Sequence, residues 1–167
     1  VVYVDSEPVA VTHARRTLDG DENCLVVEDR LPNCESVLTQ AGQLLDFTEP
    51  MAVMLVAILH FVSDEDDPEG ITARYAKATA PGSYLIASHG TAEGAGAERV
   101  RKAAAGYRGK ADYSAYLRTK EEFAAILAPY DLVEPGITWT AQWHPEDDRD
   151  VPADADHLAI YAAVGRK

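Results

Sequence analysis

The sequence predicts an α/β sandwich built on a mostly parallel sheet, and three observations lead to that prediction. Short apolar runs recur along the chain, and segments of helical character separate them. The run at residues 51–61 is apolar without alternation, which is typical of a strand buried on both faces. The last two apolar runs have no helix between them, so they are expected to form an antiparallel pair.

Strands and helices are expected to alternate over the first part of the chain, because parallel strands need crossover connections. The expected strands are residues 1–4, 24–28, 51–61 and 83–88. The expected helices are residues 7–18, 34–45, 71–80, 97–105 and 120–127. The last of these helices begins with a capping box, in which Thr119 and Glu122 each bond the other's backbone N–H.

The C-terminal part is expected to depart from this alternation. Residues 132–143 and 156–165 are strand-like, and the acidic, proline-containing segment between them has the composition of a loop. An antiparallel strand therefore closes the predicted sheet. The whole chain, residues 1–167, is expected to be one domain.

Composition excludes two classes of partner. The chain has 15 Lys and Arg against 28 Asp and Glu, a formal net charge of −13, which repels a phosphate backbone. We therefore expect no nucleic-acid substrate. The longest apolar run is far shorter than the roughly 20 residues of a membrane helix, so no membrane partner is expected.

The two cysteines, Cys24 and Cys34, do not have the spacing of a metal site. We expect them to be free thiols of a cytoplasmic protein, with no bound metal. No secretion signal is visible at the start of the sequence.

Two acidic residues follow the first two predicted strands. Ligands of open α/β sheets bind at the carboxyl ends of the strands, and a carboxylate there can accept both hydroxyl hydrogens of a ribose. Asp5 is the candidate for the ribose, although it can equally be a helix cap beside Ser6. Asp29 is the candidate for an adenine amino group, although it can equally be a solvated loop acid before Pro32. Together they indicate an adenosine-containing ligand.

Five segments of the sequence resemble one known family. They are VVYVDSEP, VVEDRLP, LLDFTEPMAVMLVAILHFVSDEDDP, ATAPGSYLIASHGTAE and LVEPGITWTAQWHPE. They are similar to the S-adenosylmethionine-dependent methyltransferase family first catalogued as a domain of unknown function. The resemblance covers nearly the whole chain. It implies a Rossmann-like class I methyltransferase fold, with strand order 3-2-1-4-5-7-6 and an antiparallel last strand.

In that fold, residues 1–5 correspond to the second strand. The first strand and the glycine-rich turn that follows it are therefore expected to be missing from this chain. Matched position by position, the resemblance implies S-adenosylmethionine as the cofactor. Its implied binding residues are Asp5, Ser6, Asp29, Arg30, Val56, Ala57 and His60.

Three side chains are weighed as contacts of the methyl acceptor. The resemblance places His60 near the expected position of the methyl group, where it could act as a base or orient the substrate. Alternatively, it is a partly buried histidine whose ring bonds to backbone groups. His89, after the fifth strand of the family's fold, has the same two interpretations. Trp143 lies in the loop between the last two strands, where it contacts substrate or packs as a rim aromatic. No catalytic residue is assigned, because positioning alone can drive methyl transfer.

The sequence therefore predicts methyl transfer from S-adenosylmethionine to an unidentified small molecule. The first alternative is a regulatory or interaction protein that binds the cofactor without turnover. The second is a fragment of an NAD-binding dehydrogenase, which the C-terminal strand pair disfavours because a further strand–helix–strand unit would be expected.

Overall fold

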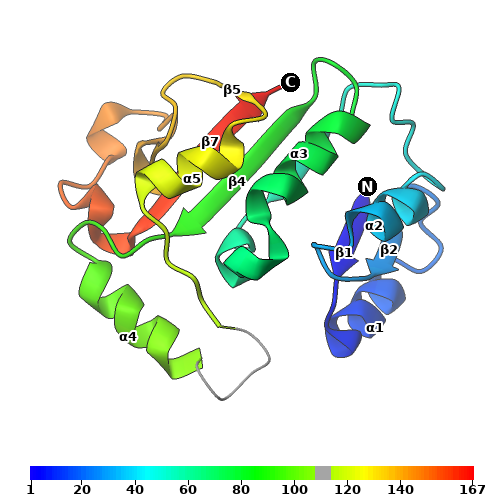
Figure 1. Ribbon diagram of the computed structural model, residues 1–167, viewed down its shortest axis with the longest axis horizontal. Coiled ribbons are helices and arrows are strands. Elements are labelled where there is room, and N and C mark those ends of the chain that lie inside the picture. Colours follow the sequence, from blue (N-terminus) through cyan, green and yellow to red (C-terminus); the bar gives the residue numbers. More distant parts are fainter. Residues whose placement is uncertain (108–113) are drawn as a thin grey trace.

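The protein has the Rossmann-like α/β fold that the sequence predicts, as seen in a computed structural model that describes residues 1–107 and 114–167. In Figure 1, helices α3 and α5 lie side by side across one face of the sheet that contains β4 and β7. Both chain termini are visible, with the N-terminus on β1 and the C-terminus after β7. The prediction of fold class is confirmed.

Residues 1–107 and 114–167 contain seven strands, which form two sheets. The strands are β1 (Val2–Asp5), β2 (Leu25–Glu28), β3 (Ala52–Leu55), β4 (Tyr84–Gly90), β5 (Asp131–Leu132), β6 (Thr138–Trp139) and β7 (Ile160–Arg166). Strands β1 and β2 pair in parallel, and so do β3 and β4. Strand β7 is antiparallel to β4 over its whole length, and β5 and β6 both pair with β7.

The order of the strands matches the expected order 3-2-1-4-5-7-6 once strand 1 of that order is omitted. One sheet reads β2-β1, and the other reads β3-β4-β7-β5. In the part of the chain that the structure describes, no strand bonds to the free edges of β1 and β3. The antiparallel β7 confirms the predicted break in the strand–helix alternation.

The helices are α1 (Pro8–Thr17), α2 (Cys34–Ala41), α3 (Pro68–Ala78), α4 (Ala97–Tyr107) and α5 (Lys120–Leu127). Short 3-10 turns occur at η1 (Leu59–Phe61), η2 (Asp64–Asp66), η3 (Thr140–Gln142), η4 (Asp148–Asp150) and η5 (Ala155–Leu158). The predicted capping box of α5 is present, with Thr119 accepting from Glu122 and the Glu122 side chain accepting from Thr119. Among the described residues, no helix combines the length and apolar character that crossing a membrane requires.

Two apolar clusters hold these elements together. The larger one packs α3 and α5 on β3, β4 and β7, and Phe123, Leu59 and Leu85 are fully buried in it. The smaller one joins α2 to α3 through Val37, Ile71 and neighbouring side chains. Because α2 follows β2, this second cluster connects the two sheets.

The prediction of one long buried strand over residues 51–61 is wrong. Strand β3 ends at Leu55, and Ala57 turns the chain with a φ of 55° before η1 begins. Met54 is 66% exposed, so β3 is not buried on both faces as expected. Among the described residues, β3 bonds to a neighbour, β4, on one edge alone, so side chains such as that of Met54 lack strand neighbours on the other side.

Candidate functional site

Asp5 and Asp29 lie together at the carboxyl ends of β1 and β2. The backbone N–H of Asp29 donates to the carbonyl oxygen of Asp5 at 3.1 Å, which continues the parallel ladder past the last strand pair. Both residues line one cavity of about 400 Å³, with Ser6 beside them. The two acids at neighbouring strand tips therefore face a common space.

Each acid also bonds to nearby groups of the chain. Asp5 accepts from the backbone N–H of Glu7 at 2.8 Å through Oδ1, which helps start α1, as the capping alternative predicted. Within the described residues, its Oδ2 has no such partner and is free for a ligand. Asp29 Oδ1 accepts from Asn33 Nδ2 at 2.7 Å and from its neighbour's backbone. Hydrogen bonds from Ser36 and Asn33 lower the pKa of Asp29, so it stays ionised at neutral pH.

The turn after β3 forms the opposite wall of this cavity. Val56 and Ala57 line it, as does Ile58. The backbone N–H of Ala57 donates to Ser88 Oγ on β4 at 2.9 Å, and this bond anchors a residue that has an unusual positive φ. The sequence places Ser88 among the residues at strand ends, but a serine there carries no signal of this specific bond.

The remaining lining of the cavity is mainly apolar. It comes from the edges of β1 and β3 and from α2 and the segment after it, through Val4, Val37, Leu38, Phe47, Val53 and Leu55. Val4 and Met54 are exposed there in this chain. The cavity thus joins an acidic end, at the strand tips, to an apolar slot between two uncovered strand edges.

Arg30 and His60 lie beyond the lining of this cavity. Arg30 reaches from the end of β2 toward η2, with Nη2 at 3.9 Å from the Asp66 carboxylate. His60 is in η1, half-buried, with its ring 6.0 Å from that of His89 between centroids. Its Nδ1 atom is buried and has no hydrogen-bond partner among the described residues, and burial lowers the pKa of the ring.

His89 and Trp143 are also outside the cavity lining. His89 is 1% exposed; its Nδ1–H donates to the Gly90 carbonyl at 2.7 Å, and its Nε2 accepts from Arg118 at 3.2 Å. Burial, above all, lowers the pKa of His89 to about 4, so the ring is neutral. Trp143 follows η3 and stacks edge-on against His144, and its buried Nε1 bonds to no residue that the structure describes.

Arg118 is the residue of this region that sequence reasoning missed. Its guanidinium, on a side chain that is 7% exposed, donates to four acceptors. They are the Leu59 carbonyl at 3.2 Å, the Val62 carbonyl at 2.8 Å, Asp64 Oδ1 at 2.6 Å and His89 Nε2 at 3.2 Å. An arginine that follows a polar, tyrosine-bearing segment and precedes a capping box gives no hint of such burial.

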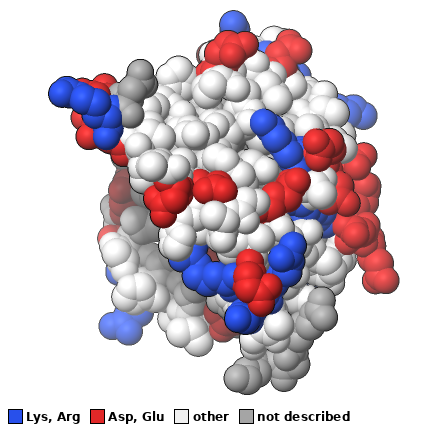
Figure 2. Space-filling model, turned by 90° about the vertical axis from the view of Figure 1, so that its left-hand side faces the viewer, with Lys and Arg blue, Asp and Glu red and all other residues white. Residues whose placement is uncertain are grey.

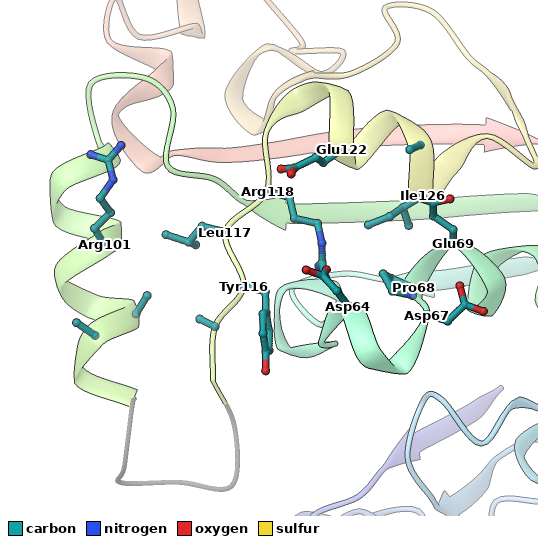
Figure 3. Close-up of a pocket in the computed structure, with 14 residues that line it drawn as sticks. Asp64, Asp67, Pro68, Glu69, Arg101, Tyr116, Leu117, Arg118, Glu122 and Ile126 are labelled. Atoms are coloured by element: carbon teal, nitrogen blue, oxygen red, sulfur yellow. The ribbon is translucent and has the colours of Figure 1, made fainter.

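A second cavity, of about 890 Å³, lies between α4 and the pair α3 and α5 (Figure 3). Asp64, Tyr116 and Arg118 stand in its wall, so it shares the segment after η1 with the surroundings of His60. On the face shown in Figure 2, Lys and Arg side chains lie close to Asp and Glu instead of forming a continuous basic surface.

The fold and the paired acids at the strand tips define a Rossmann-like protein of the class I methyltransferase type. The antiparallel β7 next to β4 distinguishes this sheet from the continued strand–helix–strand pattern expected of a dehydrogenase. The chain belongs to the S-adenosyl methyltransferase family, whose sequence model matches residues 1–167.

Solved structures agree with this assignment. A DUF574 family protein from Streptomyces avermitilis is 37% identical, with a TM-score of 0.87 over 100% of this chain and 64% of its own. A candidate methyltransferase from Thermobifida fusca is 34% identical, with a TM-score of 0.86 over 100% of this chain and 62% of its own. PigF, solved with SAH, is 15% identical and shares the fold, with a TM-score of 0.61 over 100% of this chain and 43% of its own.

The chain spans less than two thirds of the length of the first two of these relatives. Among curated proteins, no sequence matches it.

Proposed function

We propose that the protein transfers a methyl group from S-adenosylmethionine to a small-molecule acceptor. The observation that carries the proposal is the shared cavity of Asp5 and Asp29, at the strand tips where ligands of open α/β sheets bind. The family membership supports the choice of cofactor, and the structure of PigF with SAH, which has the same fold, agrees with it.

The residues present fit the two ends of such a cofactor. Asp5, with one free carboxylate oxygen, would accept from the ribose hydroxyls, and Asp29 would receive the adenine edge. Val56 and Ala57 would offer backbone groups to the amino-acid end, and Ser6 would stand beside the nucleoside. Arg30 lies outside the cavity lining and pairs with Asp66, so it would have to turn to reach the nucleoside. When bound, the cofactor supplies an electrophilic methyl group, and the sulfur keeps the electron pair of the bond that breaks.

Calorimetric titration with S-adenosylhomocysteine tests the cofactor half of the proposal. We expect binding that Asp5→Asn weakens by about tenfold or more, since a charged hydrogen bond contributes about 1.5–3 kcal/mol. The asparagine keeps an oxygen for the Glu7 N–H, so α1 should still start normally. Asp46→Asn is the matched control, because Asp46 also accepts from a backbone N–H but lies outside the cavity. Absence of binding, or an equal loss in the control, contradicts the proposal.

Label transfer separates an enzyme from a protein that binds the cofactor without turnover. Incubation with methyl-labelled S-adenosylmethionine and a cell extract should deposit label on a compound of low molecular mass. The strongly acidic chain, at −13, supports a small molecule over nucleic acid as the acceptor. Binding of S-adenosylhomocysteine with no label deposited would favour the non-catalytic alternative.

The free thiols Cys24 and Cys34 support a cytoplasmic location.

A further inference from the structure

Two buried serines brace β3 against β4, one at each end of the strand pair. Before β3, Ser83 Oγ accepts from the Met51 N–H at 3.1 Å. After β3, Ser88 Oγ accepts from the Ala57 N–H at 2.9 Å. The two bonds are alike in chemistry, but the second one lies at the carboxyl end of β3, where open α/β sheets bind their ligands.

The Ser88 bond fixes the direction of the peptide group between Val56 and Ala57. This peptide is trans, so its carbonyl oxygen and its N–H point in opposite directions. Because the Ala57 N–H points to Ser88 on β4, the Val56 carbonyl points away from β4.

The bonding of the start of β3 agrees with that direction. The Met51 carbonyl accepts from the Tyr84 N–H at 2.8 Å, so this residue directs its backbone groups to β4. Alternate residues of a strand direct their backbone groups to the same edge, which places residues 53, 55 and 57 on the β4 side. Residues 52, 54 and 56 direct theirs to the other edge, where no strand of the described residues is bonded.

That other edge of β3 borders the cavity of the paired acids. Val56 and Ala57 line the cavity, and Val2 and Val4 of β1 line it from across the gap between the sheets. Since β4 occupies the first edge of β3, the space that separates β3 from β1 lies along the second. The Val56 carbonyl is therefore a hydrogen-bond acceptor on the β3 wall of the cavity, while the donor of the same peptide is bound to Ser88.

The charges of the cavity favour a cationic group on this wall. The described residues that line it include two carboxylates, Asp5 and Asp29, and neither Lys nor Arg. A carbonyl oxygen accepts hydrogen bonds and cannot donate one to an anion. A third carboxylate would also be repelled by the two that are present. An ammonium group, which has three donors and a positive charge, suits the wall on both counts.

We propose that Ser88 is a positioning residue of the cofactor site, which directs the Val56 carbonyl at the ammonium group of the amino-acid end of S-adenosylmethionine. This inference rests on the proposed function and names the part of the cofactor that the β3 wall binds. The carboxylate of the same amino-acid end is not held by this wall. Ser88 acts through the turn at Ala57, so its loss should weaken binding and leave the methyl-transfer step unchanged.

Calorimetric titration of the unchanged protein tests which group is bound. The probes are S-adenosylhomocysteine, its analogue with hydrogen in place of the amino group, and its analogue with hydrogen in place of the carboxylate. Loss of the amino group should weaken binding by about tenfold or more, as expected for a hydrogen bond to a charged group, and loss of the carboxylate should weaken it much less. An equal or larger effect of the carboxylate overturns the inference alone, whereas failure of S-adenosylhomocysteine itself to bind overturns the proposed function as well.

Ser88→Ala, with Ser83→Ala as its matched control, tests the positioning role. Ser88→Ala should weaken S-adenosylhomocysteine by about tenfold and remove most of the preference for the amino-bearing probe, whereas Ser88→Thr keeps the hydroxyl and should keep that preference. Ser83→Ala removes the same kind of bond at the other end of β3 and should leave both quantities unchanged. In the label-transfer assay, Ser88→Ala should need more cofactor but reach the same rate at saturation. Equal weakening in Ser83→Ala and Ser88→Ala would contradict the positioning role.

Amide hydrogen exchange supplies a readout that needs no ligand. Ser88→Ala should speed exchange of the Ala57 N–H by about tenfold or more and leave that of Met51 unchanged, and Ser83→Ala should do the reverse. Unchanged exchange at Ala57 in Ser88→Ala would show that the serine does not hold this peptide, and the inference would fail.

Discussion

The N–H of Asp29 donates to the carbonyl of Asp5 at 3.1 Å, so the two acids at the candidate nucleoside site are joined through the backbone. Their side chains face one cavity from neighbouring strand ends. The distance between the two carboxylates is therefore set by a strand ladder rather than by a loop, and a ligand that uses both meets a preformed pair.

Asp29→Asn should lower stability near neutral pH and have little effect at low pH. Hydrogen bonds lower the folded-state pKa of Asp29, so its contribution is present above the ordinary value of about 3.9 and disappears as pH falls through the lower folded value. Urea unfolding of both proteins at pH 7 and near pH 2 measures this. A difference that persists unchanged at the low pH would show that the charge is not involved.

Stability should rise with pH between about 4 and 6.5 because of His89. The folded ring titrates at about 4, whereas an unfolded histidine titrates near 6.5, so the unfolded state binds more protons in this window. The change is roughly 3 kcal/mol at most, from 1.36 kcal/mol per pKa unit. Unfolding free energies measured across the window should flatten in His89→Gln. His60 contributes in the same direction, so some slope should remain.

Gly70→Ala should destabilise α3 at its start. A Cβ at this position would lie 1.8 Å from Asp67 Oδ2, and Asp67 is the residue that caps the helix by accepting from the Gly70 N–H. The carboxylate would have to move away, which costs about 1 kcal/mol of capping. Thermal unfolding provides the measurement. Gly106→Ala in α4 is the control: apart from its own helix and chain neighbours, no atom of the described residues lies within 4 Å of the added Cβ, and the change should stabilise slightly.

Thr119→Ala should cost about 1 kcal/mol by opening the capping box of α5. The helix packs Phe123 and Ile126 into the larger core, so the loss should appear as a lower midpoint of global unfolding. Thr39→Ala is the comparison, since Thr39 bonds to a carbonyl within α2 and caps no helix. Similar midpoints for the two variants would argue against the box as a source of stability.

The sequence was most informative where a local rule decides the structure. The capping box at Thr119 and the acids after β1 and β2 could be predicted because cap chemistry and strand ends depend on neighbours in the chain. The apolar run at residues 51–61 led to a wrong prediction of one buried strand. In the structure, part of this run is a strand with an uncovered edge, part is a turn at Ala57, and only part is buried. Arg118 could not be predicted, since its partners are 29 to 59 residues away. Ser88 could be placed at a strand end, but its bond to Ala57, 31 residues away, could not be predicted.

The two sheets carry different parts of the proposed ligand's contacts. Asp5 and Asp29 belong to the β1–β2 pair, whereas Ala57 and His60 follow β3, and no strand bonds link the two sheets in the described chain. Their connection runs through the α2–α3 cluster and the Arg30–Asp66 contact. A molecule that reaches from the acids to the β3 turn would contact residues of both sheets at once, so substitutions on either side should weaken the same binding event.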